Sequence, residues 1–457
     1  MSRTTLRRLV GSLLDAGSAE LRAGLLRRVS AVVMDTVAVA WAANGDPNFR
    51  KLDLLASERG QCSTALQQDS VATVEDAAFY NATAAVWNEL DEGYRGAGHP
   101  AAHVVPAGVA IAEQLALSGS DLLISVLLGY QLQAQLGVAT SLRTEVHAHG
   151  VFGAPAAALT VASLMGLDAD RATEAVNIAA NLAPAGLWES CLQGKTVRHS
   201  FAGTGAQIGI RAAQLAAGGM TAPVDSCEVG YGVIRGTEFV GWNEFDGSWA
   251  LGDGYLKQWS ACAYAHAALD VVANVCNRHD IRAEEVLYVS VSVPAVGALL
   301  SEIAYEPILA VRFSLPTLIA LAMSGYDLRN PRTADLVSKA VRDLALRVRV
   351  TEDDTMTASW PLQSQARVVI GLSDQRKFMG ETVNPATPTS DEDFAMAVAS
   401  KASQLHPSLS SGEFSDRIDA LTEAHLVSDI FSVPIPVLDA LDLQGERSRT
   451  GAARRSN

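Results

Sequence analysis

Cysteine and basic charge are both scarce in this chain of 457 residues. Its five cysteines are scattered, odd in number and never spaced as Cys-x-x-Cys. They therefore indicate neither a disulfide framework nor a zinc knuckle. Lysine and arginine total 35 against 50 aspartates and glutamates, which gives a formal net charge of −15. Nucleic-acid binding needs a basic face, so no nucleic-acid partner is expected, although a local cationic pocket can still bind an anion.

Long apolar runs are missing as well. The nearest candidate for a membrane span, 29–43, is interrupted by Asp35. The basic start of the chain leads into broken amphipathic sequence instead of a signal-peptide core. The sequence also has no glycine-rich nucleotide-binding motif and no internal repeat. We therefore expect a soluble, cytoplasmic protein without a membrane partner.

What the chain does have is apolar sequence at helical spacing. Hydrophobic residues make up 49% of it and charged residues only 19%, as in a globular enzyme. The length is too great for one core, so two domains are expected. Helices rich in alanine and glycine, such as the one predicted from Arg198 to Ala216, are expected to be buried on most sides. We predict an all-α domain over residues 1–269.

The pattern changes after about residue 270. Alternating or β-branched residues predict strands over 286–293, 346–350 and 366–370. Two helices are predicted between these strands, over 312–324 and 332–343. We predict a smaller α+β domain over 270–389. Helical pattern returns over 390–457 and is predicted to complete the all-α domain before a frayed tail. The expected fold is mainly α, with an α+β domain inserted into a larger helical one.

Polar side chains concentrate in the stretch 88–103, which holds Glu89, Asp91, Glu92, His99 and His103. Its glycines and one proline disfavour a regular helix, so a loop is predicted between rigid helices, where chemistry often lies. The acids form either a solvated turn or carboxylates that orient a histidine and fix its tautomer. His99 is either a general acid or base, or a loop histidine with one backbone bond. His103 either takes part in the site or only caps the next helix.

Further polar groups lie at or near the ends of apolar helices, at His147, His149, Arg198, Lys257 and His266. Arg198 is either an exposed charge at a helix start or a fork for a substrate carboxylate. Lys257 and His266 are either a surface lysine and a core histidine or cationic donors for an anionic substrate.

The histidines also allow a metal site as an alternative interpretation. His99 and His103 could act with His147 and His149 as ligands, but Pro100 keeps the first pair off a regular helix and no ligand motif is matched. Neither a metal nor another cofactor is therefore expected.

Seven motifs in a fixed order give the chain a resemblance to a known family. They are Asn-x-x-acid-acid with His-Pro-x-x-x-x-x-Pro-Ala (88–107), Ser-Gly-x-Asp-Leu-Leu with Gly-Tyr (118–130), His-x-x-Gly-Val-Phe-Gly-Ala-x-Ala-Ala-Ala (147–158), Gly-Leu-Asp (166–168), Arg-x-x-x-x-Gly-x-x-Ala-x-x-Gly-Ile-x-Ala-Ala (198–213), Lys-x-x-x-x-Cys-x-x-x-His (257–266) and Phe-Ser-Leu-Pro (313–316). Each motif is weak alone, but the ordered set is specific. Together they resemble the MmgE/PrpD family, which includes 2-methylcitrate dehydratase and cis-aconitate decarboxylase.

The resemblance implies a large helical domain with a smaller α+β lid domain, a homodimer, and cofactor-free chemistry on small di- or tricarboxylates. It places the family's catalytic aspartate at Glu89 and two of its active-site histidines at His99 and His266. A third histidine belongs to the loop 143–150, where His147 is the nearest candidate.

Three positions depart from the family pattern. Glu89 replaces the aspartate, Arg198 replaces an active-site lysine, and Gly93 replaces the usual threonine of the acidic motif. Glutamate is longer, arginine does not readily act as a base, and glycine has no side-chain donor. The three changes fit a branch of the family with a different substrate.

The leading hypothesis is a cofactor-independent lyase, either a dehydratase or a decarboxylase, acting on a small di- or tricarboxylate. Its catalytic residues are expected to be His99, His147, Glu89 and Asp91, with the histidines moving protons beside a carboxylate. The residues expected to bind substrate are Arg198, Lys257, His266 and His103. Two alternatives stay open: an epimerase or isomerase of an amino- or imino-dicarboxylate at the same site, and a non-catalytic paralogue that binds a carboxylate metabolite.

Overall fold

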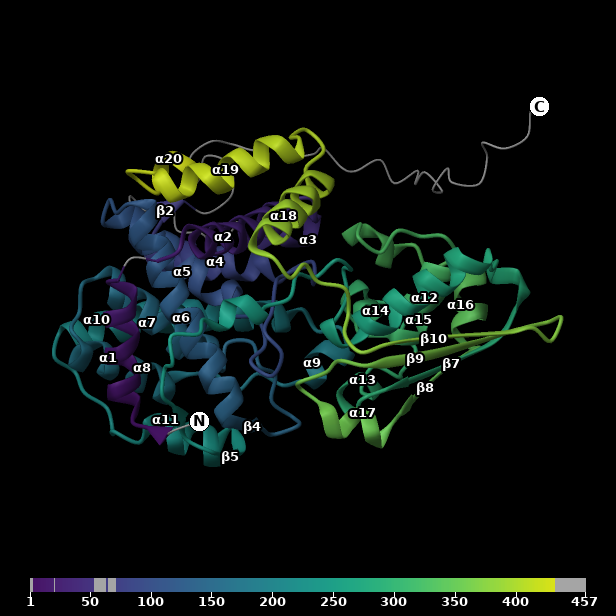
Figure 1. Cartoon of the computed structure of the whole chain (residues 1–457), viewed down its shortest axis with the longest axis horizontal. Coiled ribbons are helices and arrows are strands. Elements are labelled where there is room, and N and C mark those ends of the chain that lie inside the picture. Colours follow the sequence, from purple (N-terminus) through teal and green to yellow (C-terminus); the bar gives the residue numbers. More distant parts are fainter. Residues whose placement is uncertain (1–2, 20, 53–62, 65–70, 432–457) are drawn as a thin grey trace. The chain divides into compact units, whose positions relative to one another are not determined.

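The computed structural model describes residues 3–19, 21–52, 63–64 and 71–431, and they form two compact units (Figure 1). The first unit comprises Met1–Trp188, Val197–Leu256 and the described chain from Pro388 onward, and the second comprises Glu189–Thr196 and Lys257–Thr387. The first is built from helices, and the second contains a sheet. The predicted fold class, mainly α with a smaller α+β domain inserted into a larger helical one, is confirmed.

Ten helices of twelve residues or more carry the described part of the first unit. They are α1 (Leu6–Gly17), α2 (Ala23–Ala43), α4 (Val74–Ala85), α5 (Ala101–Gln114), α6 (Gly119–Ala139), α7 (Gly153–Leu164), α8 (Ala169–Leu182), α10 (Ser200–Ala217), α18 (Asp391–Leu405) and α19 (Ser411–Glu423). Their first turns are capped by local sequence: the side chains of Thr73, Ser118 and Asp168 accept backbone N–H groups at the starts of α4, α6 and α8. These caps satisfy donors that no helical bond can use.

Small residues let these helices pack at close range. A Cβ atom at Gly209 of α10 would lie 2.4 Å from the Cβ of Ala157 on α7, a separation that only glycine allows. Ala206, Ala212 and Ala213 on α10 are fully buried. The prediction that this alanine- and glycine-rich helix lies inside the core is confirmed.

The first unit is not purely helical, contrary to the sequence prediction. Short antiparallel pairs join β1 (Arg3–Thr4) to β6 (Trp242–Asn243) and β4 (Thr140–Leu142) to β5 (Gly236–Phe239). Another short pair joins β2 (Ser63–Thr64) to β3 (Val71–Ala72). Strands of two to four residues are too short to leave a periodic signal in the sequence.

One helix among the described residues, α6, is long and apolar enough to cross a membrane by length and composition alone. The sequence reading, which took 29–43 as the nearest candidate, overlooked it. Within the fold, 83% of the apolar window of α6 is buried. This burial is typical of a core helix, so its apolar character is explained by packing.

The second unit is a four-stranded sheet in the order β10-β9-β7-β8. Its strands are β7 (Val286–Val293), β8 (Val348–Glu352), β9 (Ala366–Leu372) and β10 (Lys377–Thr382). Strands β7 and β8 are parallel, and β9 is antiparallel to β7 and to β10. The unit also contains α12 (His266–His279), α14 (Ile308–Arg312), α15 (Leu315–Met323) and α16 (Lys339–Ala345). The three predicted strands are present, and β10 is an edge strand that the sequence reading missed.

Candidate active site

The loop between α4 and α5 carries acids that are buried, not solvated. Glu89, Asp91 and Glu92 are each no more than 2% exposed. Glu89 has a φ of +53°, a left-handed conformation that is uncommon for a residue with a side chain. The interpretation of these acids as a solvated turn is therefore wrong, and each buried carboxyl group needs partners.

Glu89 has its partner in Arg198. Arg198 Nη2 lies 2.5 Å from Glu89 Oε1, and each side chain is only 1% exposed. Arg198 Nη1 also donates to the Val86 carbonyl at 3.1 Å. Glu89 and Arg198 thus form a buried ion pair.

Asp91 lies beside His99. The Nδ1 atom of His99 lies 3.0 Å from Asp91 Oδ2 and 2.6 Å from the Glu92 carbonyl oxygen, to which it donates. A proton on Nδ1 leaves Nε2 as the nitrogen with the lone pair in the neutral ring. The His99 side chain is 11% exposed, whereas that of Asp91 is 3% exposed. The geometry is that of a histidine oriented by a backbone carbonyl with a carboxylate alongside.

Glu92 fixes the start of α5. Its Oε1 accepts the backbone N–H of Ala101 at 2.7 Å, and its Oε2 accepts the hydroxyl of Tyr130 at 3.0 Å. Burial raises the pKa of the Glu92 carboxyl to about 8, against the lowering effect of these two bonds. Near neutral pH the group is therefore mainly uncharged, and its role in this geometry is to hold the loop.

His103 has backbone partners at both ring nitrogens. Its Nδ1 donates to the His99 carbonyl at 2.9 Å, and its Nε2 accepts the N–H of Gly150 at 2.9 Å. Burial lowers the pKa of His103 to about 4, so the ring is neutral at physiological pH. The ring packs so closely on Gly153 that a Cβ there would lie 2.1 Å from its carbon atoms. His103 thereby ties the His99 loop to the loop before α7.

His149 is the histidine whose ring contacts that of His99, at a centroid distance of 4.5 Å. Its Nε2 lies 3.7 Å from Asp91 Oδ2, and its ring also contacts His147 and His103 at 4.6 and 5.8 Å. The side chain is fully buried, and neither ring nitrogen has a hydrogen-bond partner among the described residues. Burial, followed by the charge of Arg198, lowers the pKa of His149 well below its usual value. The ring is therefore neutral.

His147 lies in the same cluster but faces other partners. Its Nδ1 accepts the backbone N–H of His149 at 3.0 Å, and its ring stacks on Trp188 at 5.1 Å. His147, and not His149, is the residue of this loop predicted to be catalytic. The spacing His147-Ala148-His149 indicates that one of the two histidines belongs to the site. Which of the two rings faces His99 depends on the local backbone conformation, which the sequence does not reveal.

Tyr255 occupies the space that a side chain at position 93 would need, so only glycine fits there. A Cβ at Gly93 would lie 2.3 Å from the Tyr255 hydroxyl oxygen. The backbones of these residues form an antiparallel bridge, with Gly93 N donating to Tyr255 O at 3.1 Å and Tyr255 N to Gly93 O at 2.8 Å. The Tyr255 ring also lies 6.3 Å from that of His99. Tyr255, which was not among the predicted site residues, thus places its hydroxyl beside Gly93.

A buried lysine from α18 reaches the same loop. Lys401 Nζ donates to the Leu90 carbonyl at 2.6 Å and lies 2.8 Å from Asp35 Oδ1 of α2. Both side chains are at most 6% exposed. Leu90 lies between Glu89 and Asp91, so this contact fixes the backbone that presents both acids. Lys401 was also missed, because nothing local in the sequence links it to a loop about three hundred residues earlier.

The remaining predicted residues, Lys257 and His266, belong to the second unit. Lys257 is fully buried and is the first residue of the main segment of that unit, 257–387. His266 is the first residue of α12, and its Nε2 lies 3.4 Å from the Ala261 carbonyl oxygen. Cys262, near them, is 6% exposed, as expected for a packing residue.

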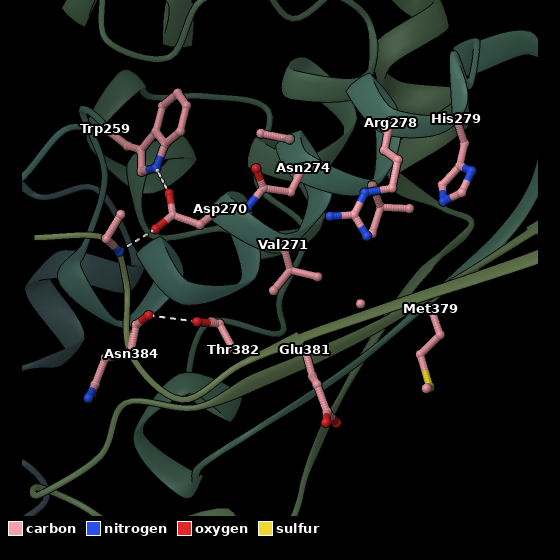
Figure 2. A pocket seen from close by; sticks show the side chains of 14 residues that line it. Trp259, Asp270, Val271, Asn274, Arg278, His279, Met379, Glu381, Thr382 and Asn384 are labelled. Carbon is pink, nitrogen blue, oxygen red and sulfur yellow. Dashed lines mark hydrogen bonds between the residues drawn. The ribbon is translucent and has the colours of Figure 1, made fainter.

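The second unit contains a cavity of about 520 Å³ along α12 and β10 (Figure 2). Asp270 lies at one end, where its two carboxylate oxygens accept Trp259 Nε1 and the Ala386 N–H, each at 2.8 Å. Arg278 and His279 lie toward the other end of the view. Lys257 and His266 are not among the residues that line this cavity, and both carboxylate oxygens of Asp270 already have partners. The candidate active site is therefore the histidine–carboxylate cluster of the first unit.

Comparison with known proteins agrees with this division. The MmgE/PrpD N-terminal domain matches residues 14–240, and the MmgE/PrpD C-terminal domain matches residues 259–409. Cis-aconitate decarboxylase of Aspergillus terreus is 29% identical over 232 residues, which cover 47% of this chain and 46% of the relative. Cis-aconitate decarboxylase of Mus musculus is 26% identical over 220 residues, covering 46% of this chain and 44% of the relative. Each alignment spans less than half the length of the relative, but the two family domains together cover most of the chain, which belongs to the MmgE/PrpD family.

Proposed function

We propose that the chain is a lyase that acts on a small di- or tricarboxylate by proton transfer at a carbon next to a carboxylate. Family membership and the two cis-aconitate decarboxylases among its relatives support a reaction of the lyase type. The proposal includes a homodimer and independence from a cofactor, both of which the family resemblance implies.

The observation that carries the proposal is the geometry of His99 and Asp91. The Glu92 carbonyl and Asp91 orient Nδ1, so Nε2 is the nitrogen that accepts a proton from a substrate carbon. When the ring becomes charged, the Asp91 carboxylate 3.0 Å away stabilises the imidazolium. A general base needs a fixed tautomer and a nearby opposite charge, and both are supplied here.

The other predicted residues take revised roles in this proposal. Glu89 is held by Arg198, so neither acts directly on the reacting carbon, and the pair positions the loop. His103 positions His99 through its backbone carbonyl. Tyr255 is added as a hydroxyl donor to the substrate beside His99. Binding of the substrate carboxylates by Lys257 and His266 remains as the resemblance implies, and His147 remains a candidate for the second proton-transfer step.

The test is incubation with candidate acids in deuterium oxide, beginning with cis-aconitate, followed by nuclear magnetic resonance. Loss of carbon dioxide or of water supports the lyase. Deuterium exchange with inversion and no group loss indicates the epimerase, and binding without exchange or loss indicates a non-catalytic paralogue. His99→Asn should lower kcat by about a hundredfold or more. A matched control is His425→Asn, which changes an exposed histidine elsewhere in the first unit and should leave turnover unchanged.

A further inference from the structure

Asp91, His99 and His149 face one another inside the first unit, and we propose that they form a binding site for a divalent transition-metal ion of the Zn²⁺ class. One nitrogen of each ring and one carboxylate oxygen lie within 4.8 Å of one another. Asp91 Oδ2 is 3.0 Å from His99 Nδ1 and 3.7 Å from His149 Nε2. Ligand atoms bonded to zinc at about 2.0–2.1 Å lie about 3–3.5 Å from one another. The three groups are therefore close to ligand spacing before an ion binds.

His149 supplies an independent observation that a ligand belongs here. Its side chain is fully buried, and neither ring nitrogen has a hydrogen-bond partner among the residues that the structure describes. Buried polar atoms normally have partners, because leaving one without a partner costs the full desolvation of that atom. An ion bound at Nε2 would use the nitrogen that already lies toward the Asp91 carboxylate.

Charge also favours a cation over an anion at this point. The nearby carboxylate of Glu89 is matched by Arg198, and Glu92 is held by Ala101 and Tyr130. Asp91 is the carboxylate that lies against the two imidazole rings. A divalent ion there would offset the Asp91 charge, and the carboxylate with two neutral imidazoles would reduce the net charge of the site to +1.

The donor set selects the class of ion. Two imidazoles with one carboxylate suit Zn²⁺, Co²⁺ and similar ions, whereas Mg²⁺ and Ca²⁺ prefer sets made of oxygen. Three protein ligands leave a coordination position open for water or a substrate oxygen. The expectation of no metal rests on Pro100, which keeps His99 and His103 off a regular helix, and on the absence of a ligand motif. The structure instead combines one histidine from each loop with Asp91, so that argument does not apply to this set.

Binding at Nδ1 requires His99 to move its proton to Nε2 and to give up its hydrogen bond to the Glu92 carbonyl, because a ring nitrogen binds a metal through its lone pair. Occupancy would thus take His99 and Asp91 out of proton transfer, so bound metal is expected to inhibit the enzyme. That consequence rests on the proposed function, whereas metal binding itself does not. A test that measures binding alone therefore separates failure of this inference from failure of the proposed reaction.

The experiment uses the full chain after treatment with a chelator, titrated with Zn²⁺ by calorimetry and with Co²⁺ by visible absorption. We expect one ion per chain. His149→Gln should weaken binding by about a hundredfold or more, because even the loss of an outer hydrogen-bond partner of a metal ligand costs about 10- to 100-fold. Asp91→Asn should weaken it similarly. His425→Gln, at an exposed histidine of the same unit, should leave the affinity unchanged.

Absence of binding, or a His149→Gln variant that binds Zn²⁺ as tightly as the parent chain, would overturn the inference. If circular dichroism shows that the variants do not fold, X-ray absorption of the Zn²⁺-loaded parent chain decides. Two imidazole ligands with oxygen ligands support the site. A spectrum with sulfur ligands, or with fewer than two imidazoles, overturns it.

Discussion

Breaking the buried pair between Glu89 and Arg198 should destabilise the first unit strongly. Glu89→Gln leaves a buried guanidinium without its carboxylate, and Arg198→Met leaves a buried carboxylate without its cation. Each loss leaves a charge where water cannot reach it, and such changes cost about 3–5 kcal/mol. At an effective dielectric constant near 20, two charges about 4 Å apart attract by about 4 kcal/mol, which agrees in size.

The double variant Glu89→Gln/Arg198→Met removes both charges. Its free energy of unfolding should exceed the value expected from adding the two single losses by about 3 kcal/mol, because no uncompensated charge remains. Urea unfolding followed by tryptophan fluorescence measures this coupling. Five of the seven tryptophans lie in the first unit, so the signal reports mainly on that unit: Trp41, Trp87, Trp188, Trp242 and Trp249.

The matched control is the ion pair of Arg7 with Asp170 in the same unit, whose side chains are 63% and 68% exposed. Solvent screens such a pair, so its double-mutant cycle should show no measurable coupling. If the Glu89–Arg198 cycle gives a coupling no larger than this control, the two charges are solvated or independently compensated. The reasoning that assigns them to each other would then be refuted.

Three further predictions follow from single contacts. Lys401→Met should lower the free energy of unfolding by about 3–5 kcal/mol, because Asp35 would stay buried without its cation. The variant should also lower kcat, because the Leu90 carbonyl loses its hydrogen bond to Lys401. Unchanged turnover in a folded variant would contradict the expected effect on kcat. His406 is buried and hydrogen-bonded to the Ala38 carbonyl, and burial is the chief cause that lowers its pKa. The unfolded chain therefore binds a proton at this histidine more readily than the folded chain does. The free energy of unfolding should consequently fall as the pH drops through about 6.5 and below. His406→Gln should flatten that fall in urea unfolding at pH 7.5 and 5.5, and an unchanged difference would count against it. Zn²⁺ should inhibit turnover and a chelator should restore it, whereas activity that requires added metal would contradict the expected independence from a cofactor.

The fold was largely predictable because its signals are periodic. Apolar residues at helical spacing over most of the first unit and alternation in β7 are local patterns, and local caps set several helix starts. The edge strand β10 was missed because Gly380 and charged residues interrupt its pattern. The short pairs such as β4 with β5 depend on contacts between distant segments, for which the sequence carries no periodic signal.

The site was predictable in its location but not in its pairings. The glycines and proline of the 88–103 stretch marked a loop, and the loop does hold the cluster. Which groups meet depends on tertiary contacts: Arg198 reaches Glu89, Lys401 reaches Leu90, and His149 reaches His99. None of these pairs is close in sequence, so residue type alone could not separate a substrate ligand from a partner of a neighbouring side chain.

The three positions at which the resemblance implies a departure from the family pattern, Glu89, Arg198 and Gly93, each have a partner in the structure. Where the resemblance implies an aspartate and a lysine, Glu89 and Arg198 form an ion pair with 2.5 Å between Glu89 Oε1 and Arg198 Nη2. Either change alone would alter the reach of one partner, whereas both together keep a buried charge matched. Gly93 in turn makes room for the Tyr255 hydroxyl. Glu89 is therefore coupled to Arg198 and Gly93 to Tyr255, and His99, with Asp91 and His149 against it, lies in the polar cluster of the first unit.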